Sequence, residues 1–280
     1  MAVKKKKAVI KPIFYVVIIA ILFIQLYPII YVMINSFKSA ADVANNPPYA
    51  LPETMFLGNY VTAIMQSKLL RYFFNSVAVA AVTLCGIVVL GSPAAYAIVK
   101  MPFKQNKLIL NIFLLGIMIP IFVVLLPMFR MYNFLGLRNT YASLFIPQIG
   151  FGLPMCIFLY TGFLRYIPDS VIESAKLDGA TSFRTFLSII FPMLKNTTMT
   201  VLTLNFINVW NEFTFANTFL TSNKMKTLPL GLMDFNGLFG LKDWGAIFAA
   251  ITITMLPTLI IYFILNKQVV AGMTSGAVKG

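Results

Sequence analysis

The sequence predicts an all-α membrane protein with six transmembrane helices, and composition and run length support this prediction. Hydrophobic residues make up 59% of the 280-residue chain, charged residues only 11%, and the mean hydropathy is +0.86. A soluble domain carries roughly 25% charged residues, so this chain has too little charge to cover a surface in water. Its apolar residues also gather into six runs of about 20 residues, the length that a helix needs to cross a bilayer. We treat residues 1–280 as one transmembrane domain.

Short polar connections separate the six runs. The runs cover about residues 13–34, 74–99, 108–129, 141–164, 198–220 and 244–265. Lys4–Lys7 precede the first run, which is too long for a signal peptide and lacks a convincing cleavage site, so an uncleaved anchor helix is the better interpretation. The more polar connection after it contains three basic residues that are expected to be exposed, namely Lys38, Lys68 and Arg71. Pro120 and Pro127 interrupt the third run.

The distribution of basic residues predicts the orientation of the helices. The chain has 22 lysines and arginines against 8 acidic residues, for a net charge of +14. With six spans, 14 of the 22 fall on the face that carries the N-terminus, and 8 fall on the other. The positive-inside rule then places both termini, and the loop between the fourth and fifth spans, in the cytoplasm. Because orientation accounts for the excess charge, we expect no nucleic-acid partner.

The chain lacks the residues of the common active sites. Histidine is absent, and no HExxH, GxSxG or paired-cysteine motif occurs. Cys85 and Cys156 both lie within predicted spans, which does not indicate a disulfide framework. We therefore expect no catalytic residue and no metal site in this chain.

A pair of short helices is predicted in the loop at about 165–197. Pro168, with Asp169 or Ser170, is typical of a helix start, because a short polar side chain can accept hydrogen bonds from the free N–H groups there. Gly179 fits the residue just past that helix, where a left-handed backbone costs little only without a Cβ.

The second helix of this pair is expected to begin near Thr181 or Ser182 and to end before Pro192. Apolar residues recur on one face of it, at Phe183, Phe186, Leu187 and Ile190. This face fits contact with a partner and packing beneath the spans equally well. A capped, charged helix pair between two spans can dock on a protein in the cytoplasm.

A polar cluster marks the fifth span. Glu212 is the only acidic residue inside a predicted span, and it has four neighbours able to bind a polar solute, namely Asn205, Asn208, Trp210 and Asn211. A charge at the bilayer centre costs roughly 2.5–3.5 kcal/mol, so Glu212 should face a wet cavity or a partner. The cluster indicates either the lining of a translocation path, with Trp210 as a stacking face, or hydrogen bonding between helices.

Several motifs together resemble the permease subunits of ABC importers. Residues 173–180 read E-S-A-K-L-D-G-A and residues 189–192 read I-I-F-P, which is similar to the E-A-A…G…I-x-L-P loop of that family. Ser174 replaces the first alanine, and Phe191 replaces the usual leucine. Four further matches resemble the second permease of maltose-type transporters: Asn59-Tyr60, F-N-S at Phe74–Ser76, V-W-N-E-F at Val209–Phe213, and the tail at 272–280.

The resemblance implies a type I ABC importer transmembrane domain in which 165–197 is the coupling loop. It also implies the partners: a second permease subunit in a heterodimer, two cytoplasmic ATPase subunits, an extracytoplasmic solute-binding protein and membrane lipid. ATP and Mg would be bound by the ATPase subunits and no cofactor by this chain, which agrees with the absence of a Walker A motif.

The resemblance also implies site residues. Those of the coupling loop are Glu173, Ser174, Ala175, Asp178, Gly179, Ala180 and Phe183. Glu173 would pair with a basic group of the ATPase; alternatively, it is only well placed in a first helical turn, worth about 0.3–1 kcal/mol. The substrate-path residues would be Asn205, Asn208, Trp210, Asn211 and Glu212. The outer loop Thr221–Asp243 would reach the binding protein, unless it is only a solvated connection.

The implied function is import of a carbohydrate, an oligosaccharide above all, across a bacterial cell membrane by alternating access. One alternative is a self-sufficient secondary transporter, but such proteins usually show intramembrane acid–base relays or inverted repeats. Here one span carboxylate and no clear repeat are found. The other alternative is a membrane scaffold without a transport path, against which the polar cluster at Glu212 argues.

Overall fold

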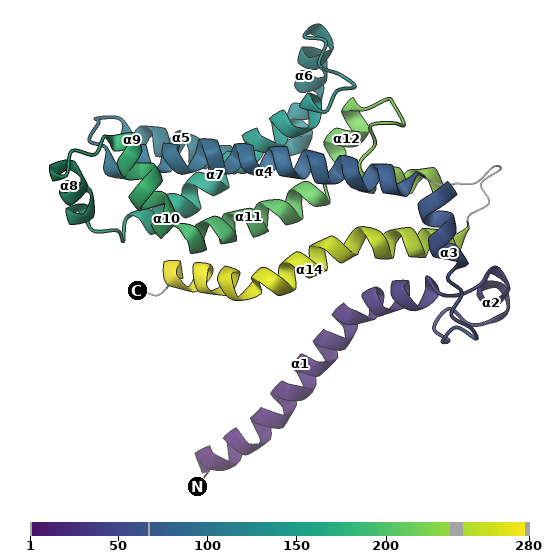
Figure 1. Cartoon of the computed structure of the whole chain (residues 1–280). Coiled ribbons are helices and arrows are strands. Elements are labelled where there is room, and N and C mark those ends of the chain that lie inside the picture. The colour runs from purple at the N-terminus through teal and green to yellow at the C-terminus, as the bar shows by residue number, and fades with distance from the viewer. Residues whose placement is uncertain (1, 67, 236–242, 278–280) are drawn as a thin grey trace. The chain divides into compact units, whose positions relative to one another are not determined.

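The computed structural model describes residues 2–66, 68–235 and 243–277, and every regular element in those ranges is helical (Figure 1). Four of these helices are long and apolar enough to cross a membrane. They are Phe14–Asn35 within α1 (Ala2–Asn35), α4 (Leu69–Lys100), α7 (Ala142–Leu164) and Trp244–Ile264 within α14 (Trp244–Ala277). Counting each of two bent helix pairs as one span raises the number to six.

The third expected span is one of the bent pairs. α5 (Asn106–Gly116) and α6 (Ile121–Phe134) meet at 94°. Pro120 explains the break, because proline lacks an N–H and disfavours a helical conformation in the residue before it. Pro120 itself takes an extended conformation directly before α6, whereas Pro127 lies inside that helix.

The fifth expected span, 198–220, is wrong in its second half. α11 (Lys195–Trp210) ends at Trp210, and α12 (Thr214–Phe219) is a separate short helix. The segment Ser182–Met193 joins α11 at 76° and forms the second bent pair. Hydropathy could not show the break, since apolar residues continue on both sides of it.

The chain forms two compact units. Unit 1 comprises Met1–Leu70 and Leu232–Met255, and unit 2 comprises Arg71–Gly231 and Leu256–Gly280. Besides α1 and the start of α14, the elements of unit 1 are α2 (Ala40–Asn45), α3 (Gly58–Val61), the π-helical turn η1 (Thr62–Gln66) and the 3₁₀ turn η3 (Leu232–Phe235).

Asn59 and Tyr60 hold the polar part of unit 1 against the end of α1. The Asn59 Nδ2 atom donates to the carbonyl oxygens of Ser36, at 2.9 Å, and Lys38, at 2.8 Å. The Tyr60 hydroxyl lies 2.7 Å from Ser36 Oγ. Buried carbonyl groups need such partners, so this part of the sequence motif has a structural role.

Unit 2 is a helical bundle in which α7 packs against α5, α11 and α12. Its larger core brings together buried side chains of α4, α7 and α11, among them Ile87, Tyr96, Ile157, Tyr160 and Val201. A smaller core lies around α12 and includes Tyr132, Leu144, Phe215, Phe219 and Leu230, the last from α13 (Leu228–Gly231). Cys85 and Cys156 are free, as expected.

Candidate functional site

The predicted helix pair is present in unit 2, and its first helix ends in a Schellman motif. α8 (Asp169–Leu177) follows Pro168, and Gly179 has the left-handed φ of 78°. The Ala180 N–H donates to the Ala175 carbonyl oxygen at 2.9 Å, and the Gly179 N–H donates to that of Lys176 at 3.0 Å. These two bonds satisfy carbonyl groups that the helix itself leaves free, so the turn is rigid.

The second helix starts as predicted but does not stop where predicted. Thr181 Oγ1 accepts a hydrogen bond from the Arg184 N–H at 3.3 Å and caps α9 (Ser182–Thr185). The helix then continues as the π-helical turn η2 (Phe186–Ile190) and as α10 (Phe191–Met193). The expected end before Pro192 is therefore wrong. Pro192 is tolerated because it occupies the start of a new helical turn, where its missing N–H has no helical partner.

The coupling-loop residues predicted from the sequence differ in exposure. Five of them are exposed: Glu173, Ser174, Asp178, Gly179 and Phe183. Ala180 is half-buried, and Ala175 is buried with Ile172 against the bundle. The structure thus brings the polar members together on the outer side of α8 and the turn after it. Ala175 serves as the packing side of the same helix.

The apolar face of the second helix is divided. Phe186 and Ile190 belong to the large core of unit 2, with Phe186 only 5% exposed. Phe183 and Leu187 are exposed, Phe183 by 70%, and Leu177 at the end of α8 is exposed by 88%. One half of the face therefore packs beneath the spans. The other half, with Leu177, leaves exposed apolar surface on the helix pair that a partner can cover.

An ion pair that the sequence did not predict fixes the start of α8. Lys100, the last residue of α4, places its Nζ atom 2.7 Å from Asp169 Oδ1 and 2.6 Å from the Ile167 carbonyl oxygen. The Lys100 side chain is 6% exposed. Lys100 is one of the 14 basic residues that the span count places on the face of the N-terminus, and Asp169 was expected only as part of a helix start. Nothing in their spacing of 69 residues links them.

The five predicted substrate-path residues separate into two groups. Asn208 and Asn211 are exposed, while Asn205 is buried and donates to the Val201 carbonyl oxygen at 2.9 Å. Trp210 is also buried, stacked on Phe206 with ring centroids 5.3 Å apart, so the expected free stacking face is not available.

Glu212 lies between α11 and α12, and not within a helix as the span prediction implied. Its carboxylate accepts hydrogen bonds from the N–H groups of Phe215, at 2.6 Å, and Ala216, at 3.2 Å. Both belong to the first turn of α12, where N–H groups have no helical partner. The carboxylate therefore stabilises the start of α12.

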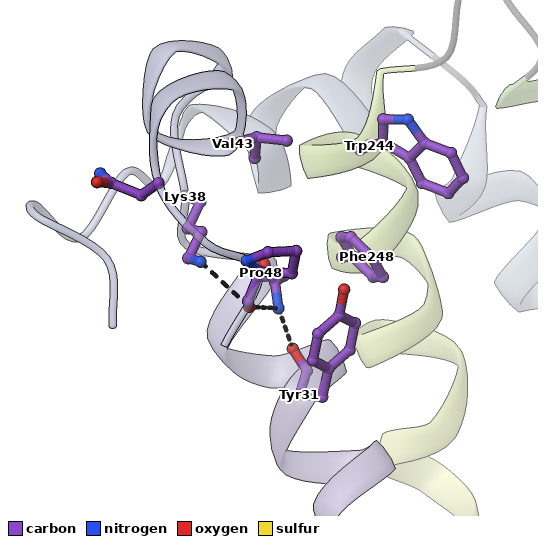
Figure 2. Close-up of a pocket in the computed structure, with 8 residues that line it drawn as sticks. Tyr31, Lys38, Val43, Pro48, Trp244 and Phe248 are labelled. Carbon is purple, nitrogen blue, oxygen red and sulfur yellow. Dashed lines mark hydrogen bonds between the residues drawn. The ribbon is translucent and has the colours of Figure 1, made fainter. Parts of the chain in front are cut away.

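Unit 1 contains a pocket of about 220 Å³ between the end of α1 and the start of α14 (Figure 2). Its aromatic lining comes from Tyr31, Trp244 and Phe248. Lys38 was expected to be exposed, but it is fully buried, and its Nζ atom donates to the carbonyl oxygens of Pro47 and Pro48 at 3.1 and 3.3 Å. The prediction fails because the chain after α1 folds back over this side chain.

The helix pair, the exposed outer side of α8 and the bent spans agree with one known family. The model of the family described as binding-protein-dependent transport system inner membrane component matches residues 87–275. The chain belongs to this family. It is accordingly a membrane transport component and not itself an enzyme.

Relatives match this permease over nearly its whole length. The trehalose/maltose transport system permease protein MalG of Thermococcus litoralis is 32% identical over 260 residues, 92% of each chain. The multiple sugar-binding transport system permease protein MsmG of Streptococcus mutans is 32% identical over 258 residues, 91% of this chain and 92% of its own.

A solved structure matches the permease in fold. It is the crystal structure of a bacterial ABC transporter involved in the import of the acidic polysaccharide alginate. It matches with a TM-score of 0.80 at 20% sequence identity, over 92% of this chain and 96% of the solved one. The helical architecture is that of a type I ABC importer transmembrane domain, as the sequence predicted.

Proposed function

We propose that this chain is one of two permease subunits in an ATP-driven importer of carbohydrates. The other subunits would be a second permease, two cytoplasmic ATPase subunits and an extracytoplasmic solute-binding protein. Both termini and α8 would lie on the cytoplasmic side, as the 14 basic residues of that face favour. ATP and Mg would be bound by the ATPase subunits, and this chain would bind no cofactor.

One observation carries the proposal: α8 has an exposed outer side and is fixed to unit 2 at both ends. The Lys100–Asp169 ion pair holds its start, and the Schellman motif at Gly179 holds its end. A rigid element can transmit a displacement that a flexible loop would absorb. When the ATPase subunits close on ATP, movement of α8 would therefore be passed to α7 and α11 and bias two states of the transport path.

The surface of the helix pair suits a protein partner. Glu173 is exposed and is proposed to pair with a basic group of the ATPase. Leu177, one turn further along α8, and Phe183 of the second helix are strongly exposed apolar side chains. Contacts of this kind combine apolar burial with a charged rim, as in stable protein interfaces.

A carbohydrate is the proposed solute because MalG and MsmG, whose similarity extends over 92% and 91% of this chain, are named for sugar transport. Asn208 and Asn211 are exposed amides at the end of α11 and can bond sugar hydroxyl groups. An oligosaccharide is the expected size class. Because Trp210 is buried, contacts to the sugar rings would come from elsewhere, in particular from the second permease.

Co-purification tests the proposal. The tagged chain is expressed with its companion permease and a candidate ATPase, and recovery of all three from detergent is measured. We expect a stable complex that Glu173→Ala weakens and that Lys176→Ala, a change of an exposed charge on the same helix, leaves intact. Recovery of this chain without any ATPase, together with solute uptake that needs no ATP, would instead favour the secondary transporter.

A further inference from the structure

A network of side chains holds the chain segment 219–228 in place at the end of unit 2 opposite α8 (Figure 1). The segment leads from α12 to α13 and has little helical structure of its own. Its two ends are packed, since Phe219 and Leu228 are fully buried. Between them, Thr221, Asn223 and Lys224 are exposed.

Asn75 of α4 bonds the middle of this segment. Its Nδ2 atom donates to the carbonyl oxygens of Lys224, at 2.9 Å, and Lys226, at 2.8 Å. Its Oδ1 atom accepts a hydrogen bond from the Tyr141 hydroxyl at 2.8 Å. The next residue, Ser76, accepts from the Leu228 N–H at 2.8 Å through Oγ. The F-N-S motif thus supplies two adjacent side chains that fix backbone about 150 residues away.

Asn139 bonds the start of the segment. Its Oδ1 atom accepts hydrogen bonds from the N–H groups of Thr221, at 3.0 Å, and Ser222, at 2.8 Å. Its own N–H donates to the Phe219 carbonyl oxygen at 2.9 Å. Asn139 has the left-handed φ of 56°, which asparagine adopts more readily than most residues. We call Asn75 and Asn139 the clamp residues.

The exposed part of the segment has the chemistry of a docking surface for an acidic protein. Lys224 is exposed, and Arg71 and Arg130 are further exposed basic residues. The exposed carboxylates among the described residues of unit 2 are Asp169, Glu173 and Asp178, which lie in the helix pair at the other end. The helix pair also exposes Lys176 and Arg184, so that end carries both signs of charge, whereas the end at segment 219–228 exposes basic residues and none of these carboxylates. In the proposed orientation, the end that lacks exposed carboxylates faces outward, where a solute-binding protein would arrive.

We propose that the clamp residues are positioning residues that hold segment 219–228 in the conformation that the solute-binding protein engages. The inference rests on the proposed function. Neither amide needs to touch the binding protein. Each removes conformational freedom from the segment before docking, so that docking does not have to order it.

The two clamp residues use opposite chemistry, which permits an isosteric test. Asn75 acts on the segment as a donor, so Asn75→Asp would place carboxylate oxygens against two carbonyl oxygens. Asn139 acts as an acceptor through its side chain, so Asn139→Asp keeps both bonds. Asn139→Gly keeps the left-handed backbone but removes the acceptor. The same change of amide to carboxylate is thus expected to break the hydrogen bonds that Asn75 donates and to keep those that Asn139 accepts.

The assay is ATPase stimulation in the reconstituted importer, titrated with the binding protein. With Asn75→Asp and Asn139→Gly, we expect the half-stimulating concentration to rise about tenfold, since two hydrogen bonds of the ordered segment are lost. The maximal stimulated rate should change little. With Asn139→Asp, the half-stimulating concentration should stay within about twofold of wild type. Cleavage by trypsin after Lys224 should accelerate in the first two variants only.

Each outcome supports or overturns one of the two proposals. An assembled wild-type complex that no candidate binding protein stimulates would overturn the proposed partner, whatever the variants do. The proposed role of the clamp residues alone would be overturned if the binding protein stimulates the wild type and Asn75→Asp and Asn139→Gly show the same titrations and trypsin patterns as the wild type. Equal impairment by Asn75→Asp and Asn139→Asp would overturn it as well. If the Asn75→Asp complex does not assemble, the comparison of Asn139→Gly with Asn139→Asp tests the role of the clamp residues.

Discussion

Lys100 at the end of α4 and Asp169 at the start of α8 form an ion pair with 2.7 Å between Nζ and Oδ1. The lysine side chain is buried and the carboxylate is largely exposed. Lys100 also donates to the Ile167 carbonyl oxygen, so one ammonium group bonds two points of the chain just before and at the start of α8. A residue at the end of a long span thereby fixes where the exposed helix begins.

Replacing Lys100 by methionine should loosen α8 without removing it. The change keeps the apolar stem but leaves the Ile167 carbonyl without its partner, which typically costs about 1–3 kcal/mol. We expect faster trypsin cleavage after Lys176 in α8 and weaker recovery of the ATPase. Asp169→Asn is the control, since Lys100 keeps its bond to Ile167. Unaltered cleavage and recovery in Lys100→Met would show that Lys100 does not position α8.

Gly179→Val should misplace the second helix and uncouple transport. A β-branched residue in a left-handed conformation costs about 1–2 kcal/mol or more. Crowding of the added Cβ is not the cause, because no atom beyond the two adjoining residues would lie within 4 Å of it. Gly179→Asn is the matched variant, as asparagine also ends helices in this conformation. The measurement is solute-stimulated ATPase activity with uptake, and a Val variant as active as the Asn variant would contradict the argument.

Phe183 and Phe186 lie three residues apart and should respond oppositely to the same change. Phe183→Ala removes an exposed ring, so thermal stability should hold while ATPase recovery falls. Phe186→Ala opens the core of unit 2, where such a change costs about 3–5 kcal/mol, and should lower the melting temperature in detergent. If Phe183→Ala leaves the complex intact, the exposed half of the apolar face is not a contact surface.

Local chemistry predicted part of this structure well. The left-handed turn at Gly179 and the cap at Thr181 depend on a few neighbouring residues, and both predictions are confirmed. The six apolar runs gave the membrane fold for the same reason, since the length of each run is a local property. The expected end before Pro192 was wrong because a π-helical turn let the helix continue.

Contacts between residues far apart in the chain could not be predicted from the sequence. Lys38 and Lys100 had the appearance of ordinary loop charges, yet the side chain of each is buried and bonds carbonyl oxygens. Asn75 carried a signal in the F-N-S motif, but its partners at Lys224 and Lys226 are far along the chain. Apolar composition on both sides of Glu212 also concealed the break between α11 and α12. The assignments of Glu173 and of the substrate path remain predictions.

Glu212 allows the two interpretations of the polar cluster to be separated. Glu212→Ala removes the acceptor of the Phe215 and Ala216 N–H groups, a loss comparable to that of a helix cap, about 0.5–2 kcal/mol. Glu212→Gln keeps one carbonyl oxygen for the shorter of the two bonds. If the carboxylate only stabilises α12, Ala should lower the melting temperature more than Gln does, and KM for the solute should hold in both.

The other outcome would restore the substrate-path interpretation. If the carboxylate binds sugar hydroxyl groups, Glu212→Gln should raise KM for uptake even though its stability stays close to that of wild type. Asn205→Leu is the control in the same cluster, because Asn205 is buried and bonds only within α11 among the described contacts. We expect the stability effect at Glu212, because both of its bonds lead to the backbone of α12.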